Sequence, residues 1–258
     1  MIPKIIHYCW FGGNPLPPLA EKCIASWRKF FPDYEIKRWD ESNFDVNIIP
    51  YTAEAYKAKK YAFVSDYARF YILYKYGGLY FDTDVEVIRS MDDIIARGPF
   101  MGCERYLEDG IQKYNGNTNI GLGVNPGLGL GVAPGLGLGI ASGLGLYKEL
   151  LDFYGKLHFE RDANGTPLHT VVDITSNLLH EKGFKDIEEI QLVDGVYIYP
   201  AEYFNPMSVV TKRMRITKNT RSIHHYMASW KPVTFTDKVK AFLRPLIPEE
   251  LLLLWNKR

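Results

Sequence analysis

The sequence predicts an α/β fold whose sheet is parallel in its main part. Two observations carry this prediction. Strand-like and helix-like segments alternate through the first half of the chain, and a Gly-Gly pair separates the clearest helix from an apolar strand. Such an order places helices over a mainly parallel sheet. With 258 residues, 47% of them hydrophobic and 24% charged, the chain can bury a substantial core.

The elements of the first half follow from residue pattern and from turn residues. The loop signal Gly12-Gly13-Asn14-Pro15 ends a β-rich run, and Gly77-Gly78 supplies the left-handed position that ends a helix. We expect, in order, a strand at 4–10, a helix at about 18–31, a strand at 34–39, a helix at 62–76 and a strand at 79–81.

A Gly/Leu-rich segment, residues 119–146, interrupts the second half. It falls into octads of alternating Gly and Leu punctuated by Pro or Ser, which predicts a Gly-rich strand and turn that has been duplicated locally. There are too few repeats for an independent solenoid. After it we expect helices at about 144–154 and 168–181 and strands at 190–193 and 196–199.

Composition excludes several classes of protein. A net charge of +1 gives no reason to expect a nucleic-acid partner. Three scattered cysteines, Cys9, Cys23 and Cys103, argue against a disulfide framework or a zinc site and for a reducing compartment. The first residues lack the apolar core of a signal peptide, so we expect a cytoplasmic protein. The uncharged stretch 119–146 carries ten glycines and two prolines, which makes it a poor membrane helix.

The acidic triplet Asp82-Thr83-Asp84 is the first candidate site. Two carboxylates spaced i, i+2 that leave a buried strand point to the same side, at the end of the sheet where open α/β folds bind ligands. Magnesium or manganese suits carboxylate oxygens together with phosphates. A structural turn would explain an isolated Asp-x-Asp equally well.

Two further groups of residues accompany the triplet. Asp66 and Arg69 are i, i+3 on the helix that leads into it, so they can present hydrogen bonds together, although a surface ion pair is the alternative. A helix antiparallel to the acidic strand would turn their face towards the metal site.

The third group is the downstream run Ile223 to Trp230. Within it, His224 or His225 can complete a metal shell, unless the two form a structural pair. Ser229 and Trp230 can donate to phosphate oxygens. A basic run just before them would suit a diphosphate or an anionic surface. It contains Lys212, Arg213, Arg215, Lys218 and Arg221.

Together these residues resemble glycosyltransferase family 32, which includes bacterial capsular polysaccharide enzymes and yeast-type mannosyltransferases and is related to glucosylating clostridial toxins. The motifs that carry the resemblance are Ser65-Asp66-(x)2-Arg69, Tyr76 to Asp84, and His224-His225-(x)3-Ser229-Trp230, with the opening run Ile2 to Gly12. It covers roughly residues 1–105 and 187–230. The Gly/Leu octads depart from the family, which has one shorter Gly-rich segment there, and this puts the acceptor side in doubt.

The resemblance implies a GT-A type fold with a Rossmann-like mixed sheet flanked by helices, and retaining transfer from a nucleotide-diphosphate sugar. By position, the resemblance implies that Trp10 lies near the nucleotide base, that Asp66 and Arg69 hold the donor sugar, and that Asp82 binds the ribose or the sugar. Asp84, together with His224 or His225, would bind Mn²⁺ or Mg²⁺. Ser229 and Trp230 would bind the β-phosphate.

These expectations define the predicted enzyme: a metal-dependent hexosyltransferase, with a UDP-sugar favoured, acting on a glycan or lipid-linked acceptor in surface polysaccharide synthesis. A metal-dependent nucleotide-sugar phosphohydrolase and a non-enzymatic carbohydrate-binding protein are the alternatives. We expect a catalytic domain over residues 1–235 and an amphipathic tail over 236–258, which either lies on the inner face of the plasma membrane or packs on a protein surface.

Overall fold

The structure is a computed structural model that describes residues 2–106, 124–126, 130–132, 143–161, 169–208 and 213–226. Its helices are α1 (Pro18–Phe30), α2 (Pro50–Lys57), α3 (Tyr61–Tyr76), α4 (Asp92–Arg97), α5 (Gly143–Tyr154), α6 (Val171–Glu181) and α7 (Ala201–Phe204). Its strands are β1 (Ile5–Cys9), β2 (Glu35–Trp39), β3 (Gly78–Tyr80), β4 (Val85–Val87), β5 (Phe100–Cys103), β6 (Val124–Asn125), β7 (Leu130–Val132), β8 (Gln191–Val193), β9 (Val196–Tyr199) and β10 (Ser222–His224).

A mixed sheet organises the fold. Its strand order is β2-β1-β3-β7-β5-β9-β8, with β6 on β5, and β4 forms a separate two-stranded sheet with β10. The β1–β2, β1–β3 and β5–β9 pairs are parallel, whereas β7 runs antiparallel to β3 and β5. The predicted α/β class and mixed sheet are therefore confirmed. The predicted Gly-rich strand corresponds to the short strands β6 and β7, and residues 119–123, 127–129 and 133–142 lie outside the described residues.

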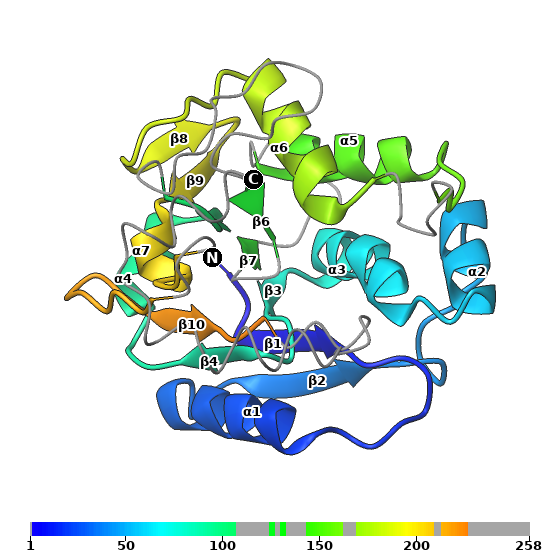
Figure 1. The fold of residues 1–258 in the computed structure, drawn as a ribbon, viewed down its shortest axis with the longest axis horizontal. Helices are drawn as coiled ribbons and strands as arrows, with labels where there is room; N and C mark the ends of the chain where they lie inside the picture. Colours follow the sequence, from blue (N-terminus) through cyan, green and yellow to red (C-terminus); the bar gives the residue numbers. More distant parts are fainter. Residues whose placement is uncertain are drawn as a thin grey trace.

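Helices cover both faces of this sheet, with α1 on one side of β1 and β2 and α3 on the other (Figure 1). Successive side chains of a strand point to opposite faces of the sheet, so β1 contributes side chains to two hydrophobic cores, one on each face. Ile6 and Tyr8 of β1 pack with α1, whereas Cys9 of the same strand packs with α2, α3 and α5. The three cysteines of the chain are free and buried.

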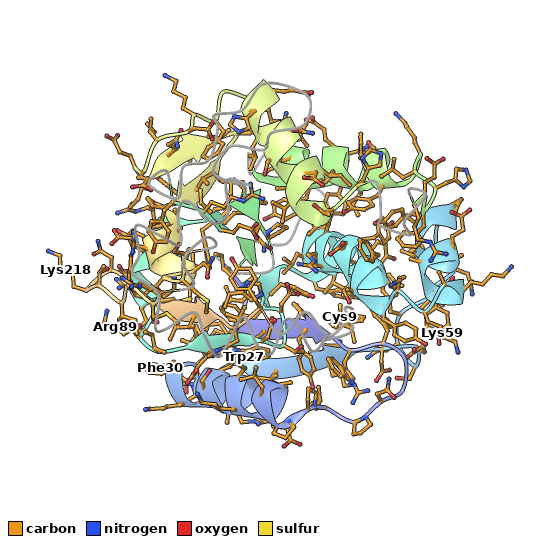
Figure 2. The ribbon with its side chains drawn as sticks, viewed as in Figure 1. Cys9, Trp27, Phe30, Lys59, Arg89 and Lys218 are labelled. Atoms are coloured by element: carbon orange, nitrogen blue, oxygen red, sulfur yellow. The ribbon has the colours of Figure 1, made fainter. Side chains whose placement is uncertain are left out.

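Trp27 anchors α1 against the strands and points toward them in Figure 2. Its side chain is fully buried, its ring lies 5.8 Å from that of Tyr8, and its Nε1–H donates to the Val85 carbonyl at 2.8 Å. Because Val85 begins β4, this hydrogen bond fixes the strand that follows the acidic triplet.

A buried histidine fixes the junction between α3 and β3. The His7 Nε2–H donates to the Gly77 carbonyl at 2.9 Å, and Nδ1 accepts from the Trp39 indole at 3.0 Å. Burial lowers the pKa of His7 to about 4, so the ring is neutral. The helix ends at the predicted glycine, and Gly77 has a positive φ of +65° with ψ −162°, a conformation that favours glycine.

Gly78 makes the closest backbone approach in this junction, and we expect Gly78→Ala to be strongly destabilising. A Cβ there would lie 2.6 Å from the Ile5 carbonyl oxygen, and φ is +99°. Strain and overpacking together should lower the free energy of unfolding by about 2–4 kcal/mol. Gly13→Ala is the matched control, since φ is +69° but no atom lies within 4 Å of a Cβ. Urea denaturation should give it a cost of only about 1–2 kcal/mol. Equal costs would contradict the clash.

Candidate active site

The acidic triplet lies in a turn. β3 ends at Tyr80, and the Val85 amide donates to the Asp82 carbonyl at 3.0 Å, which closes a turn over Asp82 to Val85. The triplet therefore follows the end of the strand, as expected, but a turn and not the alternation of a strand sets the directions of the two carboxylates. Asp82 contacts Arg69 and Asp84 contacts His224.

Asp66, Arg69 and Asp82 form one buried network. The Arg69 guanidinium lies 2.9 Å from Asp66 Oδ1 and 3.3 Å from both carboxylate oxygens of Asp82, and its Nε donates to the Ser65 carbonyl. The Tyr80 hydroxyl donates to Asp82 Oδ1 at 3.1 Å. Arg69 and Asp66 are almost inaccessible, whereas the Asp82 side chain is 28% exposed. The prediction that this helix face lies towards the triplet is confirmed, and the surface ion pair is excluded.

One guanidinium faces two carboxylates in this network. The pKa of Asp66 is raised to about 7, because burial and, to a smaller extent, the Asp82 charge raise it by more than Arg69 lowers it. Burial also works against the Arg69 charge, but Asp82, Tyr80 and Asp66 together raise its pKa. Arg69 therefore stays charged, and Asp66 is the group that titrates near neutral pH.

This titration should be visible in stability. The pKa of Asp66 is raised on folding, so between about pH 4 and pH 7 the native protein keeps a proton that the unfolded chain has released. The contribution of Asp66 to the free energy of unfolding therefore falls as the pH rises from 4 to 7 and is constant above pH 7. Asparagine does not titrate, so the Asp66→Asn protein does not lose stability in this way. We expect its free energy of unfolding, relative to wild type, to rise by about 2–4 kcal/mol from pH 4.5 to 7.5 in guanidinium denaturation. A pH-independent difference would contradict a raised pKa.

The two adjacent histidines have different partners. His224 Nε2 lies 3.3 Å from Asp84 Oδ1, and His225 Nε2 lies 2.8 Å from Glu86 Oε2, which also binds Lys22. Antiparallel pairing of β10 with β4 sets this arrangement, with His224 opposite Val85. Burial lowers the pKa of His224, but the hydrogen bond and charge of Asp84 outweigh it and raise the pKa overall. Of the two imidazole rings, that of His224 pairs with the triplet, whereas His225 contacts it through its backbone amide, which donates to the Asp84 carbonyl at 3.0 Å.

The donor set at Asp84 fits a divalent cation that is completed by its substrate. Within the described ranges no group of three His, Cys, Asp or Glu side chains could hold a metal. Asp84 and His224 supply one carboxylate and one imidazole, and His224 Nδ1 has no hydrogen-bond partner among the described residues. Mg²⁺ and similar ions commonly take one or two protein ligands plus phosphate oxygens. The pair therefore suits a cation carried with a diphosphate.

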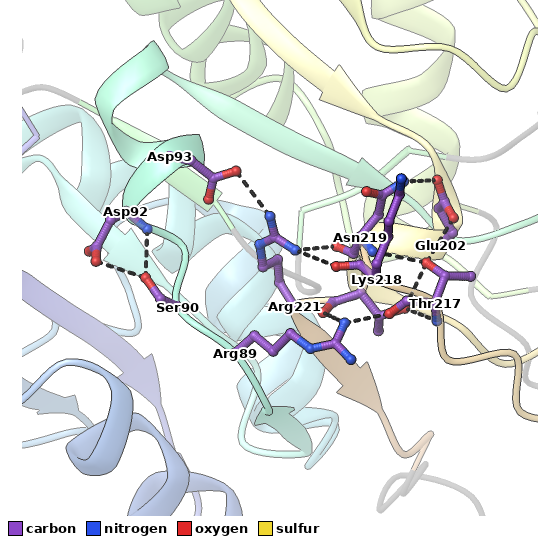
Figure 3. A network of polar contacts seen from close by, with 10 residues as sticks. Arg89, Ser90, Asp92, Asp93, Glu202, Thr217, Lys218, Asn219 and Arg221 are labelled. Carbon is purple, nitrogen blue, oxygen red and sulfur yellow. Dashed lines mark hydrogen bonds and ion pairs between the residues drawn. The ribbon is translucent and has the colours of Figure 1, made fainter.

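A polar network ahead of β10 positions this strand (Figure 3). Arg221 donates to the Asn219 carbonyl at 2.8 Å and lies 3.0 Å from Asp93, while Arg89 donates to the carbonyls of Thr217 and Thr220. Arg221, the last residue of the basic run, therefore stabilises the turn before β10 through its contacts with Asn219 and Asp93. Sequence reasoning missed Arg89 and Asp93, since isolated charges carry no motif.

The other predicted residues are placed as follows. Trp10 directly follows β1, and because β1 and β3 are parallel it lies at the same sheet edge as Asp82. Its Nε1–H donates to the Asn14 carbonyl at 2.7 Å. Ser229 and Trp230 lie outside the described residues.

The sequence matches the model of the family described as "Glycosyltransferase sugar-binding region containing DXD motif" over residues 17–101. It is 32% identical to an uncharacterized glycosyltransferase of Acanthamoeba polyphaga mimivirus over 217 residues, which is 80% of this chain and 76% of the viral protein. It is also 38% identical, over 98 residues and 36% of this chain, to inositol phosphoceramide mannosyltransferase 3 of Schizosaccharomyces pombe. The match spans 27% of that yeast protein.

The solved structures that are similar to the chain include two glycosyltransferases. The PaToxG glycosyltransferase matches 70% of each chain with a TM-score of 0.45 and 16% identity. The galactosyltransferase LgtC, in complex with donor and acceptor sugar analogues, matches 95% of this chain and 98% of its own with a TM-score of 0.39 and 14% identity.

The extent of the viral match decides the family, because it spans most of both proteins at 32% identity. The mixed sheet with helices on both faces agrees with the GT-A type of fold that the family 32 resemblance implies. The chain belongs to the family of glycosyltransferases whose sugar-binding region contains the DXD motif, here Asp82-Thr83-Asp84.

Proposed function

We propose that the chain is a metal-dependent, retaining hexosyltransferase that uses a nucleotide-diphosphate sugar, with a UDP-sugar favoured. The observation that supports this most is the adjacency of two different sets of groups. The Asp66–Arg69–Asp82 network suits sugar hydroxyls, and the Asp84–His224 pair suits a cation on a diphosphate. A single residue, Thr83, separates Asp82 from Asp84, so both sets meet on one turn.

On the sugar side, Asp82 presents the accessible carboxylate. Arg69 and the Tyr80 hydroxyl hold it in place, so its remaining lone pairs can accept from hydroxyls of the donor sugar or ribose. Asp66 and Arg69 are both almost inaccessible, so they act on the donor through Asp82. In this proposal Asp66 and Arg69 are positioning residues, and Asp82 is the group that touches the donor.

On the diphosphate side, Asp84 and His224 would hold Mn²⁺ or Mg²⁺. A bound cation neutralises charge on the leaving diphosphate. Ser229 and Trp230 are proposed to donate hydrogen bonds to the β-phosphate, where donors aimed at developing charge lower the barrier. His225 is not proposed as a ligand, since Glu86 binds its Nε2.

Retention requires either a nucleophile beneath the sugar or attack from the face that the diphosphate leaves. The site carboxylates Asp66, Asp82 and Asp84 are each engaged by Arg69 or His224. We therefore favour same-face attack, in which these residues hold the donor while the departing phosphate guides the acceptor hydroxyl.

The acceptor is proposed to be a glycan or a lipid-linked sugar of a surface polysaccharide such as a capsule, reached from the cytoplasmic face of the plasma membrane. None of the described helices has both the length and the apolar character needed to cross a bilayer. Membrane contact is proposed for the tail 236–258, which lies outside the described residues. Flotation with anionic liposomes should carry the full chain but not a chain that ends at residue 235; equal flotation would remove this role.

A donor panel tests the proposed function. Differential scanning fluorimetry with UDP- and GDP-sugars and Mn²⁺ should show one donor that raises Tm by several degrees, because ligand binding stabilises the native state. Chelation of the metal should abolish the shift. Transfer of the sugar to an acceptor then separates a transferase from a phosphohydrolase. Stabilisation by no nucleotide sugar, or release of free sugar alone with every acceptor tested, would overturn the proposal.

A further inference from the structure

A second concave site lies between α5 and α6, outside the acidic turn. It is a cleft of about 500 Å³ whose apolar lining comes from Leu150, Phe153, Ile174 and Leu178. Phe153 is 45% exposed and lies on the face of α5 that also exposes Lys148, Glu149 and Asp152. A volume of this order is typical of a small-molecule site and accommodates about two or three hexose units.

The polar part of the cleft consists mainly of hydrogen-bond acceptors. Glu149, Asp152 and Glu181 contribute carboxylates, and Asn177 contributes an amide that both donates and accepts. Such groups, placed around an exposed aromatic ring, are complementary to a sugar. Hydroxyl groups donate to the carboxylates, and the C–H face of a pyranose packs against the ring face.

The charges around the cleft are largely compensated. Lys182 lies 2.8 Å from Glu149, and Lys148 lies 2.6 Å from Asp152. Lys156 adds a further cation to the lining. A ligand with a large positive charge therefore has little to gain here, and a neutral hydroxylated ligand fits better.

The cleft is one helix away from the donor network. The neighbouring residue of Phe153, Tyr154, faces inward, is fully buried and lies 6.0 Å, ring to ring, from Tyr67 of α3. α3 also carries Asp66 and Arg69, so α5 is the wall between the cleft and the donor network. Because Tyr154 fills the space between α5 and α3, an oligosaccharide bound in the cleft would reach the reacting centre around α5, which is about 10 Å across.

We propose that the α5–α6 cleft binds a neutral oligosaccharide segment of the acceptor, with Phe153 as its stacking surface and Asn177 as a hydrogen-bonding partner. The class of ligand rests on the proposed function, in which the acceptor is a glycan. In this arrangement the cleft holds the part of the acceptor that does not react.

Ligand-observed NMR on the full chain tests this without donor or metal. The probes are maltotetraose, cellotetraose and mannotetraose. We expect saturation transfer to at least one of them, with Phe153→Ala weakening that binding at least 10-fold and Phe153→Trp preserving it. Leu192→Ala, which removes an apolar side chain that is 60% exposed on β8, is the matched control and should bind like wild type.

The proposal would be overturned by no saturation transfer to any tetraose or by equal binding of Phe153→Ala and wild type. A concentration-dependent dimer that Phe153→Ala dissociates would also overturn it, since the cleft would then bind a second copy of the chain. Asp84→Asn should leave tetraose binding unchanged. If Asp84→Asn abolished tetraose binding, the oligosaccharide would lie at the acidic turn and not in the cleft. Tetraose binding through Phe153 in a chain that no nucleotide sugar stabilises would support the cleft and refute the donor proposal.

Discussion

Replacing Asp84 with asparagine is expected to lower kcat about 1,000-fold while the fold stays intact. Asn keeps the volume and a carbonyl that His224 can bind, but removes the charge that would hold a cation beside the diphosphate. Loss of one stabilising group at developing charge typically costs 10²- to 10³-fold, and loss of the cation itself costs more. Asp84→Ala should be as inactive, and less stable, because it leaves buried His224 without its partner.

The measurement is initial-rate transfer at saturating donor and Mn²⁺, beside circular dichroism and Tm for each variant. Asp33→Asn is the control, since the Asp33 side chain is 76% exposed and makes only a 3.7 Å pair with Lys4. It should match wild type in rate and Tm. Residual activity above a few per cent in a folded Asp84→Asn protein would refute the metal role of this residue.

The largest effect on stability is expected from Arg69→Met. The substitution keeps a long side chain but leaves Asp66 and Asp82 without a cation, and Asp66 is almost inaccessible. Breaking a buried pair by removing one partner typically costs about 3–5 kcal/mol. We expect a loss of that size in free energy of unfolding at pH 7.5, together with loss of transfer.

A double variant separates lost pairing from lost packing. Asp66→Leu with Arg69→Met removes both buried charges, and replacement of a buried pair by apolar groups is often close to neutral. The double variant should therefore recover most of the stability that Arg69→Met loses, while transfer stays absent. If the double variant is less stable than Arg69→Met alone, the network is not held by charge pairing, and the interpretation fails. Urea titration of the three proteins measures this.

Local signals made most of the fold of the first half predictable. The helix that became α3 contains no breaker and ends at Gly77, and β1 and β2 have the composition of strands with loop residues after β1. The short strands β4, β5 and β10 were not predicted. They are three or four residues long, and partners distant in the chain define them: β10 exists because it pairs with β4.

The site was predictable as a set of residues and less so as a geometry. The Asp66/Arg69 face was expected near the triplet, and the contact of Arg69 with Asp82 confirms it. The turn at Asp82 was not predicted, because it depends on where β3 ends. Sequence could not separate the roles of His224 and His225, since only their pairing with Asp84 and Glu86 distinguishes them.

The most direct test of the central claim is one transfer reaction followed by proton NMR, with the matching nucleotide sugar and an acceptor glycan. After chelation the enzyme should form no product. Added Mn²⁺ should restore formation of a glycoside whose anomeric configuration equals that of the donor. Full transfer by the chelated enzyme, or a product of inverted configuration, would contradict metal-assisted retaining transfer at the Asp82–Asp84 turn.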